Sequence, residues 1–175
     1  LAAACGLDVA TGGAFVQETI PRLRRLLYSD LGVLLPPLRA RRVVGLPDGT
    51  WRVRISEVPL VDGTLRVGRR LAAEAPDRIT LLGVEAQPTL HPVTLRPASW
   101  IDDGAHALLQ QAGVHTWDTV GTLELYVLAT LRRYAYELVG IQEAQALLDG
   151  LERTHPALVR EVVPKVVSPQ LLADV

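Results

Sequence analysis

The side chains that could hold a metal ion or attack a substrate are few and widely separated in this sequence. The chain has four histidines and a single cysteine, namely His91, His106, His115, His155 and Cys5. A zinc site needs several converging ligands, and none of these residues has a second ligand at the short spacing that such sites use. One thiol cannot form an internal disulfide either, which indicates a reducing, cytosolic environment. We therefore expect neither a metal site nor a cofactor site.

The adjacent carboxylates Asp102 and Asp103 could in principle perform acid–base chemistry or bind a cation. Neighbouring residues at a helix start point in different directions, and acidic groups there offset the helix dipole, so we interpret the pair as a helix cap. The sequence has no glycine elbow around a serine and no complete glycine-rich phosphate loop. We therefore expect a protein that is not an enzyme. The alternative that stays open is a small α+β enzyme with a shallow site that uses Asp102, His106 or His115.

Arginines gather in the part of the chain where the first strands are expected, and this suggests a second alternative. They are Arg39, Arg41, Arg42, Arg52 and Arg54. Interleaved aromatic residues would indicate RNA binding, but Trp51 falls on the opposite strand face from Arg52 and Arg54. The formal net charge of -1 gives no field that would attract nucleic acid or anionic lipid. We interpret the arginines as a solvated face, and an RNA-binding module that uses these strands stays as the alternative.

The elements that must position these residues begin with a helix near the amino-terminal end. Its apolar face is formed by Val16, Ile20, Leu23, Leu27 and Leu31. Gly32 supplies the stop. Pro21 either kinks this helix or marks its first turn with Thr19 as the cap.

A small antiparallel sheet is expected next. Residues 38–44 and 51–55 predict a hairpin around a turn at residues 47–49. Asp62-Gly63 predicts a second tight turn, which would add residues 64–67 as a further strand. A helix with antiparallel strands indicates an α+β unit.

Residues 68–118 differ in composition from the residues before them, because prolines interrupt short β-branched runs. The runs at residues 79–82 and 92–95 predict strands, and residues 114–117 predict a returning strand. The exception is a helix capped by Asp102 and closed by Gly113. Its apolar face is formed by Ala105, Leu108, Leu109 and Ala112. We interpret this stretch as a strand-rich subdomain that is inserted into the first.

A long amphipathic helix follows, with Thr119 as the expected cap and Gly140 as the interruption. Its apolar stripe consists of Val120, Leu123, Val127, Leu131, Tyr134 and Leu138. Glu124, Arg133 and Glu137 fall off that stripe. The apolar face continues through Ile141, Ala144, Leu148 and Leu151, and a last helix is expected from Thr154 and Pro156 to Pro164. A helix of this kind packs against neighbours, and nothing in it is typical of catalysis.

The length and the two ends set further bounds. A chain of 175 residues can bury a real core, and 49% of its residues are hydrophobic. No apolar run approaches the length of a membrane span, and the first residues lack the features of a signal peptide. The chain contains no methionine and stops after about two turns of a helix that Ser168 would cap. We expect a fragment of a longer protein.

The last third of the chain carries a distinctive order of residues. It reads Leu131-Arg132-Arg133-Tyr134-Ala135-Tyr136-Glu137-Leu138-Val139-Gly140-Ile141-Gln142-Glu143, followed by Leu147-Leu148-Asp149 and by the segment from Pro156 to Pro164. This order resembles the cytoplasmic domain of the type III secretion export gate, the large membrane component of flagellar and virulence export machines. The runs Ile20-Pro21, Leu31-Gly32-Val33 and Pro36-Pro37 look like the virulence branch of that family, and Ala98-Ser99-Trp100-Ile101 fits its second subdomain.

The resemblance implies how the chain is divided. A first α+β subdomain would be split between residues 1–67 and 119–138, and a small strand-rich α/β subdomain at residues 68–118 would be inserted into it. Residues 139–175 would form a helical third subdomain, incomplete and truncated before a further C-terminal subdomain. The fold class that we expect is α+β.

The resemblance also implies partners and a location. In the family this region lies at the cytoplasmic face of the bacterial inner membrane and forms a nonameric ring that receives chaperones and export substrates, next to an export ATPase complex. Membrane attachment would come only through N-terminal helices that are absent here, and no nucleic acid is expected. Subunit-interface roles would fall on Arg132, Arg133, Glu137, Gln142 and Glu143.

Flagellar members bind chaperones in an apolar dimple between the first two subdomains. An acidic and an aromatic residue shortly before the Trp-Ile strand form part of that dimple. His91 and Thr94 stand at the matching positions in this sequence, so the two side-chain types of those members are replaced. With Leu125, they form the partner-binding set that the resemblance implies.

Overall fold

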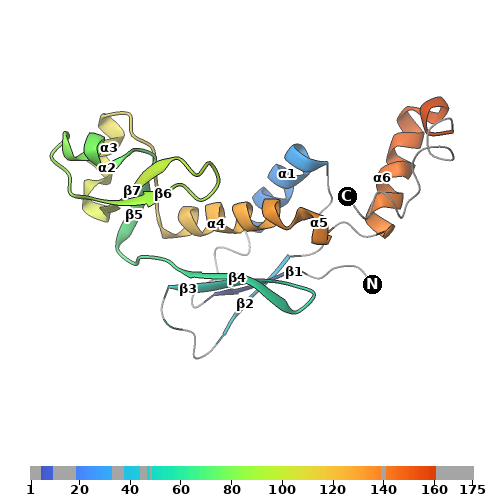
Figure 1. Cartoon of the computed structure of the whole chain (residues 1–175), viewed down its shortest axis with the longest axis horizontal. Coiled ribbons are helices and arrows are strands. Elements are labelled where there is room, and N and C mark those ends of the chain that lie inside the picture. Colours follow the sequence, from blue (N-terminus) through green and yellow to red (C-terminus); the bar gives the residue numbers. More distant parts are fainter. Residues whose placement is uncertain are drawn as a thin grey trace.

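The computed structural model describes residues 5–9, 19–32, 38–43, 47, 49–138 and 141–160 of the chain. Within these ranges, helices are combined with two four-stranded sheets (Figure 1). The α+β class is therefore confirmed. The positions of the expected subdomain boundaries stay a prediction.

The first sheet has the strand order β2-β1-β3-β4. Its strands are β1 (Cys5–Val9), β2 (Leu38–Arg42), β3 (Thr50–Ile55) and β4 (Val58–Thr64). β1 pairs in parallel with β2 and antiparallel with β3. The expected hairpin between residues 38–44 and 51–55 is wrong, because β1 lies between those two strands. A turn signal at residues 47–49 indicates that the chain reverses direction. It does not show whether another strand lies between the two strands that it connects.

The tight turn of this sheet lies at Ser56 and Glu57, whose φ angles are 50° and 67°. Asp62 and Gly63 lie inside β4 instead, so the expected turn at that point and the strand over residues 64–67 are wrong. Gly63 stands opposite Trp51, and a Cβ atom on it would lie 2.8 Å from Cζ2 of the indole. The glycine is therefore required by the close approach of the tryptophan and not by a turn.

The first helix, α1 (Ile20–Leu31), begins with Thr19 at the N-cap position and Pro21 in the first turn. The position of Pro21 in the first turn is confirmed, but the Thr19 side chain makes no capping hydrogen bond among the described residues. Gly32 closes the helix with a φ angle of 67°, and its N–H donates to the Tyr28 carbonyl oxygen at 2.9 Å. Proline suits the first turn because backbone N–H groups there have no acceptor within the helix, so its missing N–H costs no hydrogen bond.

The long helix α4 (Thr119–Arg133) begins one residue earlier than expected. Asp118 is its N-cap residue, and Asp118 Oδ1 accepts the N–H of Gly121 at 2.8 Å. Thr119 is therefore the first helical residue and not the cap. The helix also ends sooner, because Tyr134 separates it from the short helix α5 (Ala135–Leu138).

Helix α6 (Ile141–Thr154) follows, and residues 156–160 are again helical. The expected interruption at Gly140 and the expected helix end at Pro164 lie outside the described residues. None of the described helices is both long enough and apolar enough to cross a lipid bilayer.

The second sheet has the order β6-β7-β5-β8. The elements of this region are β5 (Arg69–Ala72), α2 (Pro76–Thr80), β6 (Ala86–Leu90), β7 (Pro97–Asp102), the 3₁₀ turn η2 (Asp103–Ala105), α3 (His106–Gln111) and β8 (Thr116–Trp117). Two expected strands are absent here: residues 79–82 lie in α2 and the turn after it, and residues 92–95 lie in the turn between β6 and β7. Pro76 and Asp77 start α2, and the fully buried Ile79 holds it on the sheet.

Helix α4 runs between the two sheets (Figure 1). An apolar core packs on each sheet. The larger core lies between the first sheet, α1 and α4, and includes Leu23, Leu27, Val53, Val127 and Leu131. The second sheet buries Ile79, Ile101 and Leu109 on one face. On its other face Leu71, Ala98 and Trp100 pack with Trp117 and Leu125, and Leu125 belongs to α4. One helix therefore fixes the position of both sheets.

Candidate functional site

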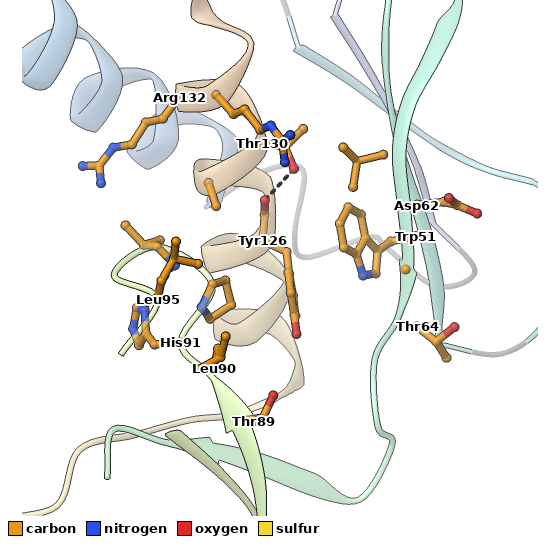
Figure 2. Close-up of a pocket in the computed structure, with 16 residues that line it drawn as sticks. Trp51, Asp62, Thr64, Thr89, Leu90, His91, Leu95, Tyr126, Thr130 and Arg132 are labelled. Carbon is orange, nitrogen blue, oxygen red and sulfur yellow. Dashed lines mark hydrogen bonds between the residues drawn. The ribbon is translucent and has the colours of Figure 1, made fainter. Parts of the chain in front are cut away.

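A groove of about 690 Å³ lies where the two sheets approach the middle and end of α4. Its walls come from β3 and β4, from the end of β6 with the turn after it, and from α4. The lining residues are Trp51, Val61, Asp62, Gly63, Thr64, Thr89, Leu90, His91, Pro92, Val93, Leu95, Tyr126, Ala129, Thr130, Arg132 and Arg133. Figure 2 shows the Tyr126 ring between Trp51 on one side and Leu90 on the other.

The centre of the groove is aromatic. The Tyr126 ring stacks on the Trp51 indole with their centroids 5.3 Å apart and their planes at 30°. Burial raises the pKa of the Tyr126 hydroxyl, while the nearby positive charge of Arg66 opposes that shift. Trp51 is only 3% exposed, and among the described residues its Nε1–H has no hydrogen-bond partner. The half-buried Tyr126 ring is therefore the part of this pair that offers a flat, neutral surface to an apolar side chain.

The turn after β6 is held by a buried histidine. His91 Nδ1 accepts the N–H groups of Val93 and Thr94, both at 3.2 Å, so the ring proton lies on Nε2 when the imidazole is neutral. The ring also meets the Trp117 indole edge-on, with centroids 4.9 Å apart. Burial lowers the pKa of His91 from its ordinary value of 6.5. The neutral histidine thus stabilises the conformation of this turn.

The turn that His91 stabilises and the end of β6 before it place two leucines at the groove. Leu90 is 55% exposed and Leu95 is 69% exposed. Leu95 has a φ angle of 56°, and its N–H donates to the His91 carbonyl oxygen at 2.9 Å. A leucine in the left-handed region is strained, and strain of this kind gathers at binding sites. The backbone therefore holds an apolar side chain in solvent, where it can contact a partner.

Two arginines from the last turn of α4 close one end of the groove. Arg132 forms an ion pair with Asp30 of α1. The Arg133 guanidinium lies 5.7 Å from the centre of the Tyr134 ring, and within the described residues it has no carboxylate partner. On the sheet wall, Asp62 pairs with Arg52 at 3.8 Å. The end of the groove near α4 is therefore positively charged.

The three predicted partner-binding residues lie in different places relative to the groove. His91 lines the groove, and Thr94 is exposed on the same turn but does not line it. Leu125 points elsewhere and packs against the second sheet. Sequence reasoning missed Trp51, Tyr126, Leu90 and Leu95 as groove residues. Their only local signal is apolar character, which a core residue shares.

The predicted subunit-interface residues spread over consecutive helices. Arg132 and Arg133 line the groove, and Glu137 is exposed on α5. Gln142 and Glu143 lie in the first turn of α6, and their side chains are outside the described part of the structure. Their role in an interface stays a prediction.

The residues of the enzyme alternative are separately held by structural partners. Asp102 Oδ1 accepts the N–H of Gly104 at 3.0 Å, which confirms the capping interpretation. His106 Nδ1 lies 2.7 Å from Thr116 Oγ1, and the His115 ring packs edge-on against Trp117. In the ranges that the structure describes, no three histidine, cysteine or acidic side chains converge as a metal site would require.

Two of the five arginines in these strands, both in β3, are paired with acidic groups. Arg52 pairs with Asp62, and Arg54 pairs with Glu57 at the turn between β3 and β4. Arg54 is also largely buried. These two pairs neutralise the positive charge of β3, which would otherwise attract an RNA backbone.

The fold defines a class of protein. It matches the solved CdsV protein of Chlamydia pneumoniae in complex with CdsO with a TM-score of 0.85 and 24% identity, over 99% of this chain and 53% of that one. It also matches the nonameric SctV-C of EPEC with a TM-score of 0.71 and 15% identity, over 99% of this chain and 52% of that one. At these identities the likeness establishes a shared fold, that of the cytoplasmic domains of export gate proteins.

The family follows from the sequence itself. The FHIPEP family is matched over residues 5–175, so the chain belongs to the FHIPEP family. Similar proteins include the low calcium response locus protein D of Yersinia pestis and the flagellar biosynthesis protein FlhA of Bacillus subtilis, each 28% identical over 91% of this chain and 23% of the relative. The resemblance to the type III secretion export gate is therefore confirmed. The chain spans about a quarter of the length of these relatives.

Proposed function

We propose that this chain forms part of the cytoplasmic docking platform of a type III protein secretion export gate and acts by binding rather than by catalysis. The observation that carries this proposal is the groove between the two sheets, with its aromatic centre and exposed leucines. Its occupants would be secretion chaperones and export substrates. Such a groove suits this role because apolar anchors that bury in a preformed pocket supply most of the energy of protein docking.

The proposal includes an internal organisation. The first sheet with α1, α4 and α5 would be the split first subdomain, residues 68–118 the inserted second, and α6 the start of a helical third. Separate apolar cores on the two sheets support this division. The groove would then lie at the boundary between the first two subdomains.

We further propose that the intact protein assembles into a ring. Its relative SctV-C of EPEC is described as nonameric, and so is the EscV cytosolic domain. Contacts between subunits would involve Arg132, Arg133, Glu137, Gln142 and Glu143. The platform would face the cytoplasm beneath the bacterial inner membrane, anchored by N-terminal helices outside this sequence. Because CdsV is described in complex with CdsO, a second secretion component and the export ATPase complex are proposed partners as well.

Site-specific photocrosslinking in cells tests the docking role. A photoreactive amino acid replaces Leu90 or Leu95 in the intact protein, and captured proteins are identified by mass spectrometry. Leu81 is the matched control, because it is an exposed leucine on the second-sheet region that does not line the groove. We expect secretion chaperones and export substrates to be captured at the groove positions and not at Leu81. Equal capture at all of these positions, or capture of no secretion component, would remove the support for a docking groove.

A further inference from the structure

Two sheet edges border the groove. β4 is the outer strand of the first sheet, and β6 is the outer strand of the second. Four consecutive residues of β4, Val61 to Thr64, line the groove. Side chains alternate between the two faces of a strand, so consecutive residues can share one groove only if it runs along the strand's edge. The groove therefore borders the backbone edge of β4.

The pairing of β3 with β4 decides which backbone groups face outward. The N–H of Leu65 donates to the Gly49 carbonyl oxygen at 2.9 Å, so this opposed pair is hydrogen-bonded. In an antiparallel ladder, hydrogen-bonded pairs alternate with pairs whose N–H and C=O groups point away from the partner strand. Gly63 and Val61 therefore bond to β3. Asp62 and Thr64 direct their N–H and C=O groups out of the sheet, toward the groove.

The edge of β6 is closed to a further strand, whereas this part of β4 has no neighbouring strand on its outer side among the residues that the structure describes. Pro88 of β6 stands opposite Ser99. Three positions further along the ladder, the His91 N–H donates to the Arg96 carbonyl oxygen, so that pair is hydrogen-bonded and, by alternation, the backbone of position 88 faces outward. Proline at an outward position removes the donor that a new strand would use. β4 has Pro59 in its first half, on the far side of the bulge at Val53 and Arg54. Its open edge is therefore Val61 to Thr64.

We propose that the groove binds its partner as an added β-strand: an extended segment of a secretion chaperone or export substrate pairs with the edge of β4 at Asp62 and Thr64. This inference rests on the proposed function and deepens it. Main-chain bonds to an edge strand supply affinity in such complexes, and alternate side chains of the added strand supply specificity. The structure provides both parts, because the open edge and the apolar centre share one groove.

The groove also indicates the chemistry of the segment. Every second side chain of an added strand would point toward the Tyr126 ring, Leu90 and Leu95, which favours aliphatic or aromatic residues at those positions. Arg133 has no carboxylate partner within the described residues and stands at one end of the groove. An acidic residue beside the apolar positions would pair with it. The occupant is thus an extended, apolar segment that carries a carboxylate.

The test uses the full chain and a fluorescent synthetic peptide of alternating valine and glutamate residues. Its derivatives are N-methylated at every second amide, in either of the two possible sets. In an added strand only one set of amides faces β4, so methylation of that set should weaken binding by about tenfold or more, as expected for each lost backbone hydrogen bond. Methylation of the other set should leave binding unchanged. The readout is fluorescence anisotropy.

A backbone variant tests the same contact from the protein side. Thr64→Pro removes the outward N–H of Thr64 without removing a bond to β3, and Thr64→Val changes only the side chain and is the matched control. We expect Thr64→Pro to abolish peptide binding and Thr64→Val to retain it, with unchanged thermal unfolding of both. Hydrogen exchange should also show that the peptide slows exchange at Asp62 and Thr64 in the unmodified chain. If Thr64→Pro does not fold, hydrogen exchange at Asp62 and Thr64 in the unmodified chain tests whether the peptide pairs with β4.

Several outcomes would overturn the strand-addition proposal: no binding of the peptide, equal sensitivity to both methylation sets, or dimerisation of the chain that Thr64→Pro abolishes, which would make a second copy the occupant. The photocrosslinking experiment is independent of these results. Capture of chaperones without methylation sensitivity leaves the docking function standing and rejects strand addition. Methylation-sensitive binding of the peptide without capture in cells would retain strand addition as a property of the groove but would reject the docking function and the proposed occupant.

Discussion

Gly63 is the residue under the tightest steric constraint in the groove wall. Its missing side chain leaves room for the Trp51 indole, whose Cζ2 would lie 2.8 Å from an added Cβ. Gly63→Ala should therefore lower the free energy of unfolding by about 1–3 kcal/mol, because the ring must shift in a packed core. Chemical denaturation followed by tryptophan fluorescence measures this loss.

Gly150 provides the control for that substitution. It lies in α6, and a Cβ atom there would meet nothing within 4 Å. Gly150→Ala should leave stability unchanged or raise it by up to about 1 kcal/mol, since alanine favours a helix. If both substitutions had the same effect, Gly63 would not be needed for the approach of Trp51.

His91 should make stability depend on pH in a defined direction. Burial lowers its pKa in the folded state below the ordinary value of 6.5. The unfolded chain therefore binds the proton first as the pH falls. The contribution is fully present above pH 6.5 and is lost as the pH falls through the folded-state pKa. Protonation of Nδ1 would also break the bonds from the N–H groups of Val93 and Thr94.

The measurement is urea unfolding at a series of pH values, for the chain and for His91→Asn. Asparagine offers an oxygen near the position of Nδ1 but does not titrate, so the variant should lose less stability below pH 6.5 than the unmodified chain. Parallel pH profiles of the two proteins would show that His91 does not carry this dependence.

At the scale of elements, two residues are candidates for the N-cap of α4, Asp118 and Thr119. Asp118 Oδ1 accepts the Gly121 N–H, whereas Thr119 is already helical. Asp118→Ala should lower the free energy of unfolding by about 1 kcal/mol, while Thr119→Ala should change it little. Thermal unfolding of both variants checks this order, and the reverse order would restore the cap that the sequence pattern predicted.

Helices α1 and α4 are joined by two ion pairs in different surroundings. Arg22 of α1 pairs with Glu124, which is 7% exposed, and Asp30 pairs with Arg132 where both side chains are partly exposed. Removal of one partner of the first pair leaves a charge in a poorly hydrated place. Arg22→Ala should therefore destabilise the chain by about 1–3 kcal/mol, and Asp30→Ala by less than about 1 kcal/mol.

Double-mutant cycles that add Glu124→Gln and Arg132→Gln measure the coupling of each pair. The Arg22–Glu124 coupling should be the larger one. Equal couplings would mean that Glu124 is as well hydrated as the outer pair, in conflict with its burial. The sequence pattern placed Glu124 off the apolar stripe, and the structure shows that it is nevertheless buried, where Arg22 of α1 pairs with it.

At the scale of the whole molecule, α4 connects the two sheets and so shapes the groove between them. Residues such as Val127 and Leu131 pack into the first core, and Leu125 packs on the second sheet. Glu137 and α6 lie beyond the end of α4 that contacts α1 (Figure 1). Arg132 and Arg133 therefore belong both to the groove and to the proposed subunit contacts, whereas Glu137 and α6 lie outside the groove lining. A substitution at Glu137 can thus test assembly without changing the groove.

In the intact protein, Glu137→Lys should reduce the fraction of closed rings, because a reversed charge in a subunit contact costs more than one in water. Glu85→Lys is the matched control on the second-sheet region, where Glu85 is exposed. Mass photometry measures the distribution of assemblies. Equal ring fractions for the two variants would exclude Glu137 from the interface.

The elements that the sequence predicted well are those with local causes. The first helix, its stop at Gly32 and the capped helix after Asp102 each follow from side chains within a few residues of one another. The errors arose where a local signal had a distant explanation. Gly63 has the composition of a turn residue, but its cause is an indole on the neighbouring strand.

The sequence by itself determined the α+β class, the family and the positions of most helices, because helical periodicity and family resemblance are properties of residue order. Only the tertiary structure decided the rest. The strand β1 lies between β2 and β3 through pairing that no turn signal encodes. The groove unites Trp51, Leu90 and Tyr126, which lie far apart in the chain, and an open strand edge is defined by the partner that a strand lacks.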